Sequence, residues 1–131
     1  AEAGVAALPT HGDFRPNHPS ATPLPADCVG LVFIGRTSCP NPRNLGALSQ
    51  AIERGADLVY GDADEIDARG RRRPRFKPDF SLDLFLHDDF VSDCVAVSRA
   101  LLDKVDPWIF DDPHGTLLGW VSRASRVEHL P

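Results

Sequence analysis

Runs of apolar residues, separated by short polar turns, divide this chain into alternating strands and helices. Val29 to Ile34 is a nearly continuous apolar run, which is typical of a strand buried on both faces of a parallel sheet. A second run, Leu58 to Tyr60, is short and rich in β-branched and aromatic residues. Both runs predict strands, and each ends at a glycine, Gly35 and Gly61.

A helix is predicted between these two strands. Asn41 has the side chain of an N-cap, Pro42 suits the first helical position, and Gly55 suits the position just past the end. Its apolar residues recur at helical spacing, on one face: Leu45, Leu48 and Ile52. Strand, helix and strand therefore predict one βαβ unit with a right-handed crossover and two parallel, adjacent strands.

The rest of the chain repeats the mixture of helices and strands. The further predictions are an edge strand or helix stub at 5–8, an arginine-rich hairpin tip at 68–75, a strand at 90–97, helices opening at Ser98 and Asp112, and a strand at 127–130. The fold class is therefore α/β. Five prolines between Pro9 and Pro25 exclude a long regular element, so we divide the chain into a proline-rich N-terminal segment, 1–25, and an α/β domain, 26–131.

Composition narrows the class of protein. The chain has 131 residues, 42% of them hydrophobic, and a net charge of -5, which disfavours nucleic acid or an anionic membrane surface as the main partner. The arginines at 68–75 fit a solvated turn better than a nucleic-acid site. No apolar run is long enough for a transmembrane segment. Three cysteines without a C-x-x-C pair predict reduced thiols and a cytoplasmic location. The lack of methionine predicts either a processed terminus or, in preference, a domain of a larger polypeptide.

Carboxylates follow the second strand directly. Asp62 and Asp64, which are separated by one residue, belong to an acidic stretch after Tyr60. In open α/β sheets ligands bind beyond the carboxyl ends of the strands, and such a pair can offer oxygens to Mg²⁺ or Mn²⁺ and its phosphates. The alternative is an acidic, solvated turn without a ligand, because a single Asp-x-Asp is a weak motif.

The order of several motifs adds a family resemblance. It is carried by the stretch from Ala56 to Asp67, then Gly70, Phe76-Lys77-Pro78-Asp79-Phe80-Ser81, Asp83-Leu84, Ser98 to Leu102, and the end from Arg126 to Pro131. In this order and spacing, residues 26–131 resemble family 2 glycosyltransferases, in the branch of rhamnosyltransferases and O-antigen sugar transferases. The resemblance implies a GT-A fold, which is a Rossmann-like, three-layer α/β/α domain with a mostly parallel sheet. It also implies a nucleotide-diphosphate sugar donor, a glycan acceptor, a divalent cation and inverting transfer in polysaccharide biosynthesis.

Two features depart from the family pattern at the donor site. The family's usual acidic motif follows the central strand, where this chain has Gly35-Arg36-Thr37. Either the guanidinium of Arg36 offsets the diphosphate charge in place of a cation, or the site has decayed. Asp62 and Asp64 match a second acidic cluster and are the remaining candidate metal ligands. The family's first βαβ segment has no counterpart here, so the domain resembles the C-terminal part of a GT-A domain.

The resemblance also indicates residues near the acceptor. Lys77 and Asp79 match the family's Lys-Pro-Asp phrase and complete the predicted binding residues. The catalytic base is expected near the start of the helix at Asp112, but the usual acidic dipeptide is absent from that register. Asp112 is either the catalytic base or only the N-cap of this helix. His114, with an ordinary pKa near 6.5, is the other candidate base.

Three functions remain open from the sequence. The first is a glycosyltransferase, and the second is a catalytically silent module of the same ancestry that serves binding or assembly. The third is a carboxylate-based metal hydrolase, which lacks the histidine cluster expected of that class.

Overall fold

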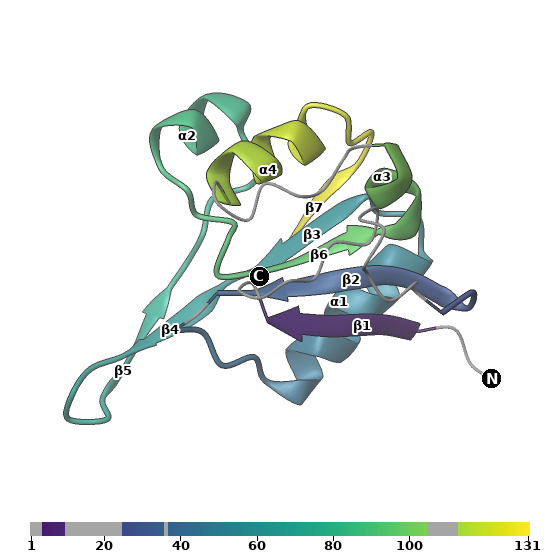
Figure 1. Cartoon of the computed structure of the whole chain (residues 1–131). Helices are drawn as coiled ribbons and strands as arrows, with labels where there is room; N and C mark the ends of the chain where they lie inside the picture. Colours follow the sequence, from purple (N-terminus) through teal and green to yellow (C-terminus); the bar gives the residue numbers. More distant parts are fainter. Residues whose placement is uncertain (1–3, 10–24, 36, 105–112) are drawn as a thin grey trace.

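The chain folds around a five-stranded mixed sheet with helices on both faces (Figure 1). The computed structural model describes residues 4–9, 25–35, 37–104 and 113–131. The elements in chain order are β1 (Gly4–Pro9), β2 (Cys28–Ile34), α1 (Pro42–Glu53), β3 (Leu58–Gly61), β4 (Ala63–Ile66), β5 (Arg72–Arg75), α2 (Leu82–His87), β6 (Cys94–Ser98), α3 (Arg99–Lys104), α4 (Pro113–Val121) and β7 (Val127–Leu130). The predicted α/β class is confirmed.

The order of strands in the sheet is β1-β2-β6-β3-β7. β1 pairs with β2 and β3 with β7 in parallel, whereas β6 is antiparallel to both of its neighbours. The prediction of a mostly parallel sheet is therefore wrong, because the sheet is mixed and the separate β4–β5 ribbon is antiparallel too. The predicted adjacency of β2 and β3 is also wrong, since β6 lies between them, although the two strands do run in the same direction.

Burial explains why the apolar pattern misled the prediction of strand direction. Val95, Ala96 and Val97 of β6 are each at most 1% exposed, so successive residues are buried on both faces of the sheet, as they are in β2. A strand covered on both faces needs apolar residues throughout, whichever way it runs. The pattern therefore predicts burial and leaves direction and neighbours undetermined.

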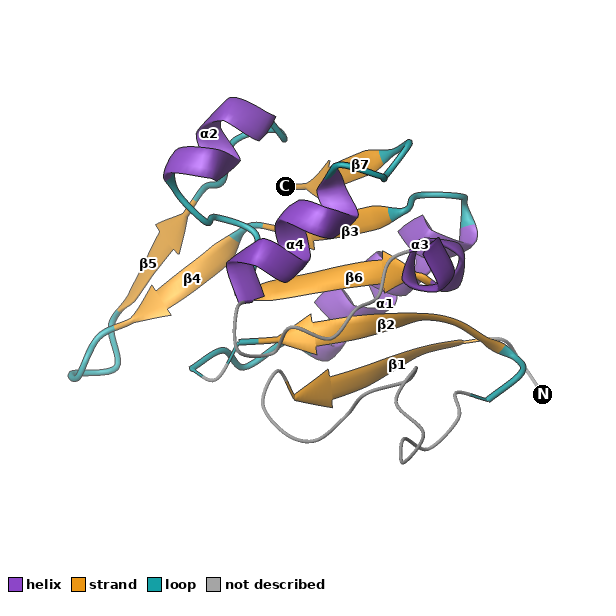
Figure 2. Ribbon diagram, turned by 45° about the horizontal axis from the view of Figure 1, so that its top comes forward, coloured by secondary structure: helices purple, strands orange, loops and turns teal. Residues whose placement is uncertain are grey.

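Two hydrophobic clusters cover the two faces of the sheet (Figure 2). On one face α1 contributes Leu48, Ala51 and Ile52, which pack on Val32, Val59 and Ala96 of the central strands. The other face carries the larger cluster, in which α2, α3 and α4 contribute Phe85, Leu101, Leu102, Leu117, Trp120 and Val121 against Leu31, Phe33, Leu58, Tyr60, Val95 and Val97. The alternation of side chains along each strand thus feeds both clusters.

The predicted punctuation of α1 is confirmed. Asn41 has extended backbone dihedrals, and its side-chain oxygen accepts a hydrogen bond of 2.8 Å from the Arg43 N–H. Pro42 is the first helical residue, where its missing N–H removes nothing. Gly55 follows the helix with φ of 103°, a left-handed conformation that glycine adopts without steric cost.

Replacing Asn41 with alanine should reduce the free energy of unfolding by about 1 kcal/mol, the usual value of an N-cap. The reason is that the Arg43 N–H loses its side-chain acceptor. Chemical denaturation measures the change. Asn41→Ser is the matched control, and it should stay close to the wild type because serine caps helices as well as asparagine does. Equal losses for both variants would contradict the capping role.

Three further sequence predictions concern the N-terminal strand, the cysteines and membrane-spanning segments. The N-terminal residues Gly4–Pro9 form an edge strand, so the strand alternative was correct. The three cysteines, Cys28, Cys39 and Cys94, are free thiols. Among the helices that the structure describes, none is long and apolar enough to cross a membrane.

Candidate functional site

Strand direction brings several polar residues to one edge of the sheet. β2, β3 and β7 run the same way, so they end at the same edge, and the antiparallel β6 begins there. We call this edge the rim. At the rim the Gly35 N–H donates to the Asp93 carbonyl at 2.8 Å, which joins the end of β2 to the start of β6. The Asp62 N–H donates to the Leu130 carbonyl at 3.2 Å, which joins β3 to β7.

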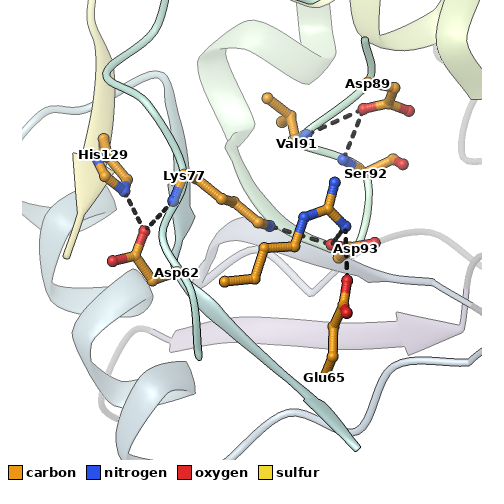
Figure 3. Close-up of polar contacts among 9 residues, drawn as sticks. Asp62, Glu65, Lys77, Asp89, Val91, Ser92, Asp93 and His129 are labelled. Carbon is orange, nitrogen blue, oxygen red and sulfur yellow. Dashed lines mark hydrogen bonds and ion pairs between the residues drawn. The ribbon is translucent and has the colours of Figure 1, made fainter. Parts of the chain in front are cut away.

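Lys77 connects two of these strand ends (Figure 3). Its backbone N–H donates to Asp62 Oδ1 at 2.8 Å, just after β3. Its side chain is only 2% exposed, and the ammonium lies 3.4 Å from Asp93 Oδ2, just before β6. Arg75 Nη1 lies 3.8 Å from the same oxygen of Asp93. Arg75 Nη1 is also 3.8 Å from Glu65 Oε1, so two cations face two carboxylates at this point of the rim.

His129 lies between two carboxylates on the other side of Asp62. Its Nε2 is 2.8 Å from Asp62 Oδ1, and its Nδ1 is 3.0 Å from Asp79 Oδ1. The imidazole is 10% exposed, whereas the Asp79 side chain is 98% exposed. Both ring nitrogens must carry a proton to donate to both carboxylates, so this arrangement favours the charged imidazolium.

Tyr60 contacts both His129 and the segment that follows Lys77. Its hydroxyl donates to the Pro78 carbonyl at 2.6 Å, and its ring stacks on His129 with 5.0 Å between centroids. The tyrosine is fully buried in β3, in register with His129 of β7. A rigid strand residue therefore holds both the histidine and the segment after Lys77.

Burial and hydrogen bonding shift the pKa values of this cluster. Burial alone would raise the pKa of Asp62, but hydrogen bonds from the Lys77 N–H and His129 hold it below its ordinary value. Burial alone would lower the pKa of His129, but its bonds to Asp79 and Asp62 raise it above 6.5. Burial, helped by the charges of Asp79 and Asp62, raises the pKa of Tyr60 to about 12. At neutral pH the tyrosine is therefore a neutral donor.

Comparison with known proteins gives one partial similarity. Over 80 residues the chain is 36% identical to the O-antigen biosynthesis protein RfbC of Myxococcus xanthus. The matched stretch covers 60% of this chain and 6% of RfbC. No protein-family model matches the chain, and no solved structure matches it.

The rim brings together five of the nine residues that the sequence selected. Gly35 and Thr37 follow β2, and the other three, Asp62, Lys77 and Asp79, lie in the network around His129. Gly35 is tightly enclosed, since a Cβ there would lie 3.1 Å from Ser38 Oγ and 3.3 Å from the Asp93 carbonyl.

The remaining predicted residues do not join this network. Asp64 lies on β4, where its Oδ2 is 3.8 Å from Arg72 Nη1 and its side chain is 49% exposed. His114 belongs to the first turn of α4. Arg36 and Asp112 lie outside the described residues, so their predicted roles stay predictions.

A divalent cation finds a poor set of ligands here. Asp62 Oδ1 already accepts from Lys77 and His129, and Asp64 belongs to the ribbon. Within the described ranges, no group of three or more His, Cys, Asp or Glu residues is arranged to hold a metal ion. A hard cation prefers six or more oxygens, so the carboxylates that the sequence selected do not build a resident site by themselves.

Sequence reasoning missed three residues of the rim: Asp93, His129 and Arg75, which it assigned to a solvated turn. Asp93 interrupts the apolar alternation of the strand predicted at 90–97, and in the structure it directly precedes β6. His129 gave no signal, because its position depends on the pairing of β7 with β3 in a register that places it beside Tyr60. That register cannot be read from either strand alone.

Proposed function

We propose that this chain is a glycosyltransferase-like domain of polysaccharide biosynthesis, and that its rim receives the diphosphate of a nucleotide-sugar donor. Two observations support the proposal: the similarity to an O-antigen biosynthesis protein, and the convergence of the β2 and β3 ends, where ligands bind in α/β sheets. On this proposal the domain is a divergent, partial GT-A fold of the family 2 glycosyltransferases and belongs to a larger polypeptide.

The observation that carries the proposal is the charge around Asp93. The buried Lys77 ammonium and the Arg75 guanidinium both face the Asp93 carboxylate, which is 41% exposed, and Arg75 also faces Glu65, which is 64% exposed. A phosphate oxygen that displaces the Asp93 carboxylate from these contacts would meet two cations already in place. Preorganised charge of this kind stabilises a leaving diphosphate. Arg36, one residue beyond Gly35, is proposed as a third cation for the same diphosphate.

The chemistry proposed here uses the chain's own cations. Because the described carboxylates fit a metal ion poorly, the proposed reaction has no step that uses a metal ion. Lys77, Arg75 and Arg36 offset the charge on the leaving diphosphate, and a base takes the proton of the acceptor hydroxyl. His114 and Asp112 stay the proposed bases, on the resemblance alone.

Donor binding should depend on Lys77. The probe is UDP-glucose, titrated by calorimetry, with dTDP-rhamnose as a second donor and with either manganese or EDTA present. Lys77→Met should weaken binding of the preferred donor at least about tenfold, because a charged hydrogen bond contributes about 1.5–3 kcal/mol and 1.4 kcal/mol is tenfold. Chelation should change the affinity little.

Lys104→Met is the matched control for this experiment. It removes the same charge from α3, which follows the far end of β6 on the opposite edge of the sheet, and it should leave donor binding unchanged. A thermal melt of both variants tests folding. Equal weakening by both substitutions, or binding that requires manganese and Asp64, would overturn the metal-free diphosphate site.

A second function is a catalytically silent module that binds without transferring sugar. The observation that favours it is the internal pairing of Asp62 with His129, which occupies the best remaining carboxylate. Release of nucleotide diphosphate from the bound donor, with and without an acceptor, separates the two. Binding without release supports the silent module, and turnover that is lost in His114→Ala supports the enzyme.

A further inference from the structure

Of two neighbouring residues beside the rim, the apolar one is exposed and the charged one is buried. Phe76 is 80% exposed, whereas the side chain of the next residue, Lys77, is 2% exposed. Leaving a phenylalanine in water forgoes the favourable free energy of its burial, and burying a charge carries a penalty of its own. Lys77 is buried where it serves the rim. The exposure of Phe76 has no such explanation within the fold.

Phe76 extends one face of the β4–β5 ribbon, on which apolar and charged residues alternate. The ribbon pairs Asp64 with Pro74 and Ile66 with Arg72, so these residues share one face, and the strand period places Phe76 on the same side. Ile66 is 63% exposed. We call Asp64, Ile66, Arg72, Pro74 and Phe76 the ribbon face. Figures 1 and 2 show the ribbon projecting away from the five-stranded sheet.

The ribbon is positively charged in an acidic protein. Residues 63–75 contain five arginines and three acidic residues, a net charge of +2, while the chain as a whole carries -5. On the ribbon face Arg72 is 3.8 Å from Asp64, and the two side chains are 72% and 49% exposed. An exposed pair at that separation contributes little, so the Arg72 guanidinium is available to another carboxylate.

We propose that the ribbon face binds an acidic glycan, which is the acceptor substrate of the domain. One sugar ring packs its C–H face on Phe76, and a uronate carboxylate of the same glycan pairs with Arg72, whose fork matches carboxylate geometry. The inference rests on the proposed function, which supplies the reason for a glycan.

Geometry also gives the size of this ligand. Phe76 follows β5 directly and stands four residues from Arg72, or about 13 Å at the 3.3 Å per residue of an extended chain. A single sugar ring cannot reach both, so the ligand is an oligosaccharide. Its end at Phe76 lies next to Lys77, whose N–H binds Asp62, and the ribbon face therefore leads the glycan toward the rim.

Other occupants suit this face less well. A second copy of the chain would bring its own arginine-rich ribbon against this one, and like charges repel. The acidic chain as a whole opposes nucleic acid and anionic lipid. An acidic oligosaccharide is small enough to meet the positive ribbon without meeting the rest of the surface.

The test is binding of defined oligosaccharides without donor. A hexasaccharide of alternating glucuronate and N-acetylglucosamine should bind the chain, with NMR shifts at Phe76 and along β5, and maltohexaose should bind at least about tenfold more weakly. Phe76→Ala and Arg72→Gln should each weaken binding of the acidic probe about tenfold, and Phe76→Tyr should retain it. Leu86→Ala removes an apolar side chain that is 51% exposed on α2 and is the matched control.

Each contrary result overturns the inference. These are equal binding of the neutral probe, full binding by Phe76→Ala, or no binding of either probe by the wild type. Stronger binding to anionic vesicles, or self-association that Phe76→Ala abolishes, would assign the face to a lipid or a second copy. The donor site and the acceptor site can be disproved independently. Phe76→Ala should leave donor affinity unchanged, and Lys77→Met should leave binding of the hexasaccharide unchanged.

Discussion

Replacing Phe85 with alanine should reduce the free energy of unfolding by about 3–5 kcal/mol, the range for truncating a buried phenylalanine. Phe85 is 0% exposed, and its ring centroid lies 6.1 Å from Phe80 and 6.3 Å from Phe90. It is the buried residue of α2, a helix of six residues that is too short to be stable alone. Its removal leaves a cavity and detaches the helix from the larger cluster.

Urea denaturation of Phe85→Ala measures this loss. Leu86→Ala is the matched control, because it is the next residue on the same helix and is half exposed. The control should change the unfolding free energy by no more than about 0.5 kcal/mol. A similar loss for the two variants would mean that α2 does not pack as described.

Replacing His129 with glutamine should change how stability depends on pH. The pKa of His129 is raised in the folded chain, so folding strengthens proton binding there. The contribution of His129 is therefore complete below about pH 6.5, the ordinary pKa of histidine, and is lost as pH rises through its folded pKa. Glutamine does not titrate, so the variant should lack this loss.

Asp62 limits the same network at acid pH. Its pKa is lowered from 3.8 in the folded chain, so its contribution is complete above that value and is lost as pH falls through the folded pKa. The network is therefore strongest between about pH 4 and 6.5. The bond from His129 to Asp62 should contribute about 1.5–3 kcal/mol there. The bond to Asp79 adds little, because that side chain is 98% exposed.

Unfolding free energies of the wild type and His129→Gln, measured by urea from pH 4 to pH 9, test this expectation. His87→Gln is the control, since His87 is exposed at the end of α2 and should leave the pH profile of the wild type in place. A profile for His129→Gln that parallels the wild type would show that the imidazole does not hold the charge assigned to it.

The sequence predicted those parts of the structure that neighbouring residues determine. Asn41, Pro42 and Gly55 determined the limits of α1, and a hairpin turn lies within the predicted tip at 68–75, because caps and turns depend on local chemistry. Residues 72–75 of that predicted tip form the strand β5. The order of the sheet was not predictable in this way. Nothing near Val95 shows that its strand enters between β2 and β3, because that position depends on pairing across the whole chain.

The same distinction separates the predicted from the missed parts of the candidate site. Lys77 and Asp62 were found because they lie in a motif with a definite order and spacing. Asp64 stands only two residues after Asp62, yet the chain leaves the main sheet at this point and enters the ribbon. Asp64 therefore lies on β4, away from the rim. Asp93 and His129 join the site only through tertiary pairing, so no local pattern could identify their partners.

The late position of β6 in the chain bears on biosynthesis. During translation β2 and β3 emerge first, and the strand that must join them follows only after residue 93. Until then each would present an unpaired edge, which is a template for pairing with other chains. We therefore expect a ribosome-bound nascent chain to remain prone to aggregation until β6 has left the exit tunnel, and β2 and β3 to join one sheet only at that stage.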